Sequence, residues 1–458
     1  MRRVLPIFVL LCATAGYAQE ETRIAVPYER FVLPNGLNVI LHEDHTTPTV
    51  SVNVWYHVGS GREKAGRTGF AHLFEHIMFE GSGHVPEGEF DNWLEAAGAS
   101  NNGSTTQDRT NYYEDLPASA LELALFLESD RMGYLLAAMS PEKVDGQRDV
   151  VKNERRQSYE NRPYGFAFPT MFEHLFPASH PYSWPVIGSM EDLSAASYED
   201  VVEFFTHWYS PANASLSIAG DIDPIKARAL VEKWFVDVPT GDPVPPAGVM
   251  SAYLTEEQRP LLEDRVSLPR MYMAWLSPAI YAPGDAELDI LGSILTDGKN
   301  SRLYKRLVYE LQIAQDVNAF QYALEQGSSF WIIATARAGH DLDELEAVIQ
   351  EEIDRLKMEA PTEREVQRAV NQYEAGFLDG LERVGGFGGK ANTLNSYYFR
   401  TGNPDYFNED LARYKAIDPV DIRAVARAYL RDNGRVILSV VPEGQPELAA
   451  SGARPKTD

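Results

Sequence analysis

The chain has 458 residues, enough for two or three domains, and its 67 acidic residues against 41 lysines and arginines give a formal net charge of −26. Because an acidic surface repels phosphate groups, this charge argues against nucleic acid as a partner. Cys12 is the only cysteine, so intrachain disulfides and clusters of cysteine metal ligands are excluded.

The first 18 residues have the pattern of a secretory signal peptide. Two arginines at positions 2 and 3 precede an apolar stretch, and small residues lead up to Ala18. The stretch is too short to cross ~30 Å of hydrocarbon, and no later apolar run is long enough. We therefore expect cleavage after Ala18, loss of Cys12 with the leader, and a periplasmic or secreted protein without a membrane span.

Strand patterns open the folded part of the chain. Residues 30–44 contain two apolar runs around an Asn-Gly pair, which indicates a hairpin, and alternating β-branched residues predict a strand within 47–60. The period then changes to that of a helix over 69–79, with Thr68 as its expected cap. Further along, the patterns predict a helix from 90, a polar hairpin before 117, long helices over 118–158 and a strand at 213–223.

The second half repeats the first in outline. A segment with five prolines and little periodicity, at 238–260, is the best candidate for a linker. A strand and a helix follow it, as they do in the first half, and both halves end in a helix and then a strand. We predict these divisions: signal peptide 1–18, N-terminal domain 19–238, linker 239–261, C-terminal domain 262–445 without the histidines of the first, and polar tail 446–458.

The sequence HLFEH places two histidines and a glutamate within one helical turn. On a helix, His72, Glu75 and His76 share one face. Two imidazoles there can bind one zinc ion, which needs a third protein ligand and keeps a fourth position open to water. Zinc lowers the pKa of that water towards ~7, and a neighbouring carboxylate can accept its proton. The pattern predicts His72 and His76 as ligands and Glu75 as general base, although these five residues alone also fit histidines hydrogen-bonded in a core.

HLFEH is also the inverted zincin signature, H-x-x-E-H, and the chain resembles the pitrilysin-type peptidases, which include insulin-degrading enzyme and the mitochondrial processing peptidase. The resemblance covers almost the whole mature chain. It implies an α+β fold of two duplicated α/β-roll domains, each an antiparallel-rich sheet flanked by helices, that form half of a clamshell. The segments that carry the resemblance, in the family's order, are 66–82, 98–117, 147–165, 207–221 and 298–317.

The resemblance also assigns roles that the residues alone do not. It implies Glu154 as the third ligand of one zinc ion per chain. Where the family has an acid that supports a ligand, this chain has Gln147, which can donate a hydrogen bond but supplies no charge. It implies that an extended peptide substrate lies along Asn101, Asn102 and Gly103 as along a sheet edge, although these residues also fit a plain polar turn.

The resemblance breaks in the second half. Single-chain family members bring an Arg and a Tyr from this half to hold the substrate and the developing oxyanion. Arg306 fits the arginine and is the expected substrate contact, but Ile313 stands at the tyrosine position and cannot donate a hydrogen bond. Three explanations stay open: a different register, a substitute such as Tyr304 or Tyr309, or a second protein. We favour a heterodimer with a homologous subunit that supplies the pair, and otherwise a homodimer.

Together these observations predict an exported zinc endopeptidase or oligopeptidase that cleaves peptides or unfolded segments. One alternative is a scaffold or chaperone-like subunit that keeps the fold without turnover. A second is a zinc-dependent peptide-binding protein. The intact set of His72, Glu75, His76 and Glu154 favours the enzyme, because a scaffold needs none of them.

Overall fold

The structure is a computed structural model that describes residues 23–242, 244 and 250–455. The predicted signal peptide and part of the predicted linker lie outside these ranges. Within the described part of the chain, no helix is both long and apolar enough to cross a bilayer.

The N-terminal domain is built on one six-stranded sheet. Its strands, in spatial order, are β1 (Glu29–Val32), β2 (Asn38–Glu43), β6 (Ala214–Gly220), β3 (Thr49–Tyr56), β5 (Thr110–Pro117) and β4 (Ser100–Thr105). Only the β2–β6 pair is parallel. Its helices are α1 (Phe70–Ile77), α2 (Glu89–Ala96), α3 (Leu121–Ala138), α4 (Pro141–Arg155), α5 (Ala167–Leu175), α6 (Met190–Ala195), α7 (Tyr198–Trp208) and α8 (Pro224–Phe235).

The C-terminal domain repeats this plan. Its strands, in spatial order, are β12 (Arg454–Pro455), β7 (Pro260–Asp264), β11 (Arg435–Pro442), β8 (Arg270–Ser277), β10 (Ser328–Ala336) and β9 (Ala314–Tyr322). Its helices are α9 (Asp285–Thr296), α10 (Leu342–Met358), α11 (Glu363–Gly380), α12 (Lys390–Thr401), α13 (Phe407–Lys415) and α14 (Pro419–Tyr429). The first and last long strands, β7 and β11, are again parallel, and β8 is antiparallel to β11. This agreement in order and direction confirms the predicted fold class and the duplication.

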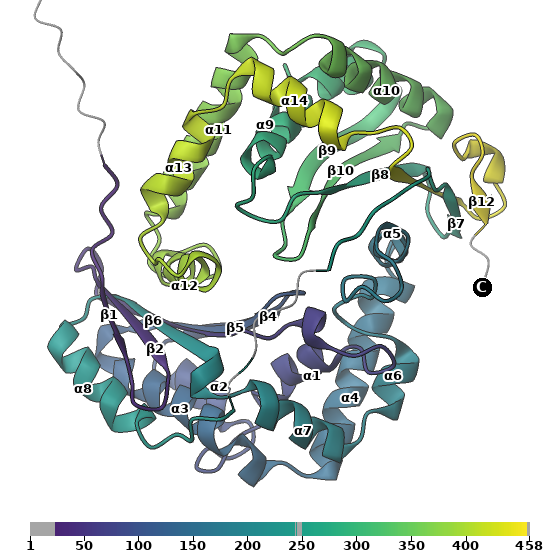
Figure 1. The fold of residues 1–458 in the computed structure, drawn as a ribbon. Helices are drawn as coiled ribbons and strands as arrows, with labels where there is room; N and C mark the ends of the chain where they lie inside the picture. The colour runs from purple at the N-terminus through teal and green to yellow at the C-terminus, as the bar shows by residue number, and fades with distance from the viewer. Residues whose placement is uncertain (1–22, 243, 245–249, 456–458) are drawn as a thin grey trace, which may run out of the picture.

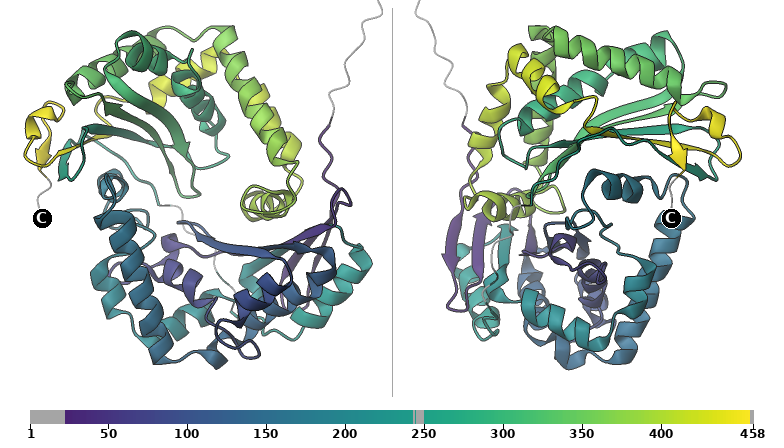
Figure 2. Two further views of the ribbon diagram at one scale, coloured as in Figure 1. Left: turned by 180° about the vertical axis from the view of Figure 1, so that it is seen from behind. Right: turned by 45° about the vertical axis from the view of Figure 1, so that its right-hand side comes forward.

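The two domains face each other and exchange one helix each (Figure 1). Helix α5 of the first half contacts β8 and β11 of the second sheet, and its equivalent α12 contacts β3 and β6 of the first. Figure 2 shows the same arrangement from two further sides, with α5 against the second sheet and α12 against the first. Phe172 of α5 packs against Trp331, and Asn395 of α12 donates to the backbone oxygen of Asn53 at 2.8 Å. The halves are therefore joined by reciprocal packing.

Part of the predicted polar tail is packed against the protein. Residues 454–455 form β12 and pair with the outer edge of β7, and Ala450 is buried in the core of the C-terminal domain. The backbone N–H of Arg454 donates to the carbonyl of Arg259 at 2.9 Å. The polar composition of this segment reflects an edge strand, which is exposed on one side.

Candidate metal centre

Helix α1 presents an apolar face to the core and a polar face to a cavity. Leu73, Phe74 and Ile77 are fully buried in the N-terminal core. The intervening residues His72, Glu75 and His76 are partly exposed on the opposite side. The apolar spacing therefore fixes the orientation of the HLFEH turn.

The start of α1 is stabilised by Glu63, which the helical pattern does not reveal. Its N-cap is Gly69, with a φ of 89°, and not Thr68. A Cβ at Gly69 would lie 2.6 Å from the carbonyl oxygen of Ile187, so the close approach also requires glycine. The buried carboxylate of Glu63 accepts hydrogen bonds from the N–H groups of Gly69 (3.0 Å) and Ala71 (2.8 Å). The Glu63 carboxylate therefore accepts hydrogen bonds from backbone N–H groups that have no acceptor within the helix.

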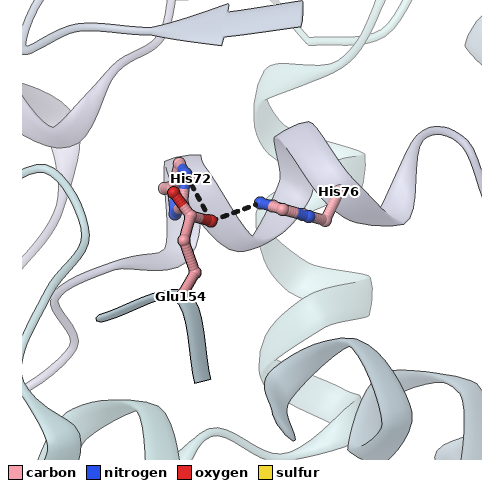
Figure 3. A group of neighbouring side chains, drawn as sticks. All are labelled: His72, His76 and Glu154. Atoms are coloured by element: carbon pink, nitrogen blue, oxygen red, sulfur yellow. Dashed lines mark ion pairs between the residues drawn. The ribbon is translucent and has the colours of Figure 1, made fainter. Parts of the chain in front are cut away.

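Helix α4 brings the third predicted ligand to α1. The Oε2 atom of Glu154 lies 3.1 Å from Nε2 of His76 and 3.7 Å from Nε2 of His72 (Figure 3). Two ligand atoms on a tetrahedral zinc ion are about 3.4 Å apart when each bond is about 2.1 Å. Among the described residues, these three form the one group of His, Cys, Asp or Glu side chains whose donors converge closely enough for a metal. The residues present therefore fit zinc.

The protonation states also suit a cation. Burial lowers the pKa of His72, which favours the neutral imidazole. The hydrogen bond with His76 lowers the pKa of Glu154, although burial opposes this. Neutral imidazole and ionised carboxylate are the forms that bind a metal ion.

Glu75 lies beside this cluster and contacts the edge strand β4. Its Oε2 accepts a hydrogen bond from the Thr105 hydroxyl at 2.7 Å. A Cβ at Gly103 would lie 3.1 Å from Cγ of Glu75, so strand and base are in close contact. Gly103 and Thr105 line the same cavity as Glu75, whereas Asn101 and Asn102 do not. Asn101 donates instead to Asp91 of α2, and Asn102 accepts from the N–H of Gly103.

Two other predicted residues lie away from the cluster. Gln147 donates from Nε2 to Oε1 of Glu80 at 2.5 Å and not to a predicted ligand. Arg306 pairs with Glu351 at 2.6 Å and Glu352 at 2.8 Å on α10. Ile313 belongs to the C-terminal core. Within this chain, neither Arg306 nor Ile313 lines the cavity that holds the metal cluster.

The cavity has a volume of about 600 Å³ and is shared by both domains. From the second domain, Arg270 and Tyr272 on β8 line it, and from the loop after α4, Arg162 and Tyr164 do so. The sequence patterns do not predict these four residues or Thr105 as part of the site. Only the tertiary packing brings them to the HLFEH helix, and no local pattern marks them.

An i,i+4 histidine pair, a glutamate from a second helix and a free carboxylate beside them, on one half of a duplicated α+β fold, define an inverted zincin-type centre. Comparison with known families agrees with this class. Residues 38–174 match the family described as Insulinase (Peptidase family M16), and residues 195–373 match the Peptidase M16 inactive domain. The chain belongs to peptidase family M16.

The chain is also similar in sequence to individual proteins over most of its length. The chain is 26% identical over 449 residues to "Zinc protease PqqE" of Helicobacter pylori, which covers 96% of this chain and 99% of the relative. It is 23% identical over 440 residues to "Probable mitochondrial-processing peptidase subunit beta, mitochondrial" of Arabidopsis thaliana, and the alignment covers 92% of this chain and 78% of that protein.

Solved structures of the family have the same fold. A protease from Helicobacter pylori superposes with a TM-score of 0.85 at 26% identity, covering 91% of this chain and 100% of that one. A protein from Pseudomonas fluorescens described as a peptidase M16 inactive domain gives a TM-score of 0.80 at 17% identity, covering 94% and 100%. The second similarity concerns the fold alone.

Proposed function

We propose that this protein is a zinc-dependent endopeptidase or oligopeptidase with one zinc ion per chain. The observation that carries the proposal is the convergence of His72, His76 and Glu154 beside Glu75, in a cavity that the edge strand β4 also lines. A scaffold would not need Glu75, whose carboxylate lies next to the three proposed ligands without being one of them.

The side chains divide the chemistry among them. His72, His76 and Glu154 would hold a zinc ion, which would supply Lewis acidity to a peptide carbonyl and to the attacking water. Glu75 is placed to accept a proton from the attacking water and to deliver it to the leaving amine. The Thr105 hydroxyl fixes one Glu75 oxygen, so the other remains available for that proton.

Strand β4 suits an extended peptide. Among the strands that the structure describes, it is the last of its sheet, so one of its edges pairs with none of them. A substrate that pairs with this edge by backbone hydrogen bonds would pass over Glu75 with little sequence demand. Because a folded protein cannot present such a strand, we propose peptides and unfolded segments as substrates, with contacts along Asn101, Asn102 and Gly103.

We further propose that the mature protein is exported after cleavage behind Ala18 and works with a homologous subunit. This chain offers no arginine and tyrosine pair at the cavity from the segment around Arg306 and Ile313, so the partner would supply the pair. Native mass spectrometry of protein purified from its source tests the assembly. A single chain type would contradict the heterodimer and leave the homodimer.

The decisive experiment is hydrolysis of quenched-fluorescent peptides by the purified assembly. We expect activity that a chelator removes and zinc restores, and none in Glu75→Gln with its zinc content unchanged. Peptide binding without hydrolysis in the wild type would favour a binding protein. A chain without activity or peptide binding would favour a scaffold.

A further inference from the structure

The cavity beside the HLFEH helix is also lined by an arginine that is held in place by the second domain. Arg270 is the first residue of β8. Its Nε donates to the Thr335 hydroxyl at 2.8 Å, and Nη1 donates to the Tyr272 hydroxyl at 3.5 Å. Its Cζ lies 3.8 Å from the centre of the Tyr164 ring. A guanidinium fixed by three groups loses little conformational entropy when it binds a ligand.

The Tyr164 ring that supports Arg270 is itself anchored to the second domain. Its hydroxyl donates to the carbonyl of Leu268 at 2.8 Å, and its N–H donates to Asp264 at 2.7 Å. Its φ of 60° lies in the left-handed region, which costs a non-glycine residue about 1 kcal/mol. These contacts hold the ring under the guanidinium despite that cost.

The charge of Arg270 is not neutralised by an adjacent acid. Among the described residues, its guanidinium forms no ion pair with a carboxylate. The closest acidic group in its hydrogen-bond chain is Asp316, which is bound on the far side of the Thr335 hydroxyl at 3.0 Å. Arg162, which is exposed and lines the same cavity, likewise forms no ion pair within the part of the chain that the structure describes. Two guanidinium groups without a paired carboxylate therefore line this cavity.

The groups around these cations suit part of a peptide. Phe168, on α5, is 39% exposed, lines the cavity and packs against Trp331. Ile187 contributes a further apolar surface. One cavity is thus lined by residues of the predicted metal cluster, by guanidinium groups and by apolar side chains. An arginine fork of this kind pairs with a carboxylate through two parallel hydrogen bonds.

We propose that Arg270, assisted by Arg162, forms a subsite for a carboxylate group of the peptide substrate. The carboxylate belongs to an acidic side chain or to the peptide's C-terminus, and both use the same chemistry. This inference rests on the proposed peptidase function and adds a substrate class to it. Because the chain as a whole is strongly acidic, selection for a carboxylate has to come from these local groups.

Binding experiments can test the subsite without turnover. We would titrate peptides by calorimetry into the zinc-loaded Glu75→Gln protein, in its native assembly. The parent peptide is uncharged and has an amidated C-terminus. One set of peptides carries a single glutamate at successive positions, and another peptide has a free C-terminus. These arms separate a side-chain carboxylate from a terminal one.

Three variants, each made in the Glu75→Gln background, assign the preference to Arg270. We expect Arg270→Gln to weaken binding of at least one carboxylate peptide about tenfold or more, as for loss of a hydrogen bond to a charged group, with the parent peptide within twofold. Arg270→Lys keeps the positive charge but not the two parallel donors of the guanidinium. Its affinity for the carboxylate peptide should lie between that of Arg270→Gln and that of the parent protein. Arg228→Gln is the matched control, because Arg228 also stacks on an aromatic ring, Phe31, but lies on α8 outside the cavity.

Three results would overturn the inference: no carboxylate preference in the parent protein, a preference that survives Arg270→Gln, or equal weakening of all peptides. The last would mean that Arg270 only holds the domains together. A different result would refute the peptidase proposal. If the protein binds carboxylate peptides through Arg270 but never hydrolyses a peptide, the subsite is supported and the peptidase function is refuted.

Discussion

Replacing Thr105 by valine should slow peptide hydrolysis without removing the metal. The substitution keeps the branched shape of the side chain and deletes the hydroxyl that donates to Glu75 at 2.7 Å. A hydrogen bond to a charged group contributes about 1.5–3 kcal/mol. Because both side chains are partly exposed, we take the lower end. About 1.5 kcal/mol corresponds to an approximately tenfold lower kcat.

The assay is steady-state hydrolysis of a quenched-fluorescent peptide by the assembly purified with each variant. Thr206→Val is the control, because the Thr206 hydroxyl on α7 donates to the carbonyl of Val202 on an exposed surface. Zinc content, measured by atomic emission, should equal that of the wild type in both variants. An unchanged kcat in Thr105→Val would refute the positioning role. Loss of zinc would show that Thr105 supports the ligands and not the base.

Three further predictions concern the metal, the domain interface and pH. Glu154→Gln should lower zinc occupancy at least tenfold in competition with a chelator, whereas Glu75→Gln should retain it, because only the first change removes a charged ligand. Asn395→Ala should destabilise the chain by about 2 kcal/mol in urea unfolding, since it removes the side-chain amide that donates to the buried oxygens of Asn53. Burial, with the charge of Asp108, raises the pKa of Glu325 from 4.5 to about 8. Its contribution to stability is complete below about pH 4.5 and is lost as pH rises through 8, so Glu325→Gln should raise the melting temperature at pH 9 but not at pH 5, by scanning calorimetry.

The metal helix could be predicted from sequence because its signal is local. The spacing of Leu73, Phe74 and Ile77 sets the buried face, and the histidines then lie together on the other. The cap could not be predicted in the same way. Thr68 is an acceptable capping residue by type, but Glu63 reaches the helix from an earlier turn, and helical periodicity gives no information about such a contact.

Residues that converge from distant segments carry no local signal. Thr105 and Arg270 reach the cavity because a hairpin and a strand of the other domain end there. In sequence, each has the usual residue type for an exposed strand. Arg306 shows the reverse case, since its neighbours resemble a family segment while its guanidinium pairs with two glutamates on α10. A resemblance in sequence does not determine which carboxylate an arginine contacts.

The second domain lines the cavity of the candidate metal centre, although none of the three proposed ligands belongs to it. Glu154 lies near the C-terminal end of α4, followed by the π-helical turn η3 (Arg156–Glu160) and the loop with Tyr164. Tyr164 is bonded to Asp264 and Leu268 of the second domain, and α5 then packs against β8 and β11. Helix α4, which carries Glu154, packs on α1 within the first domain, and the segment that follows it is bonded to the second domain. The geometry of the cluster therefore depends on the packing of α4 on α1 and not on the HLFEH helix alone, and the second domain fixes the chain that leaves α4.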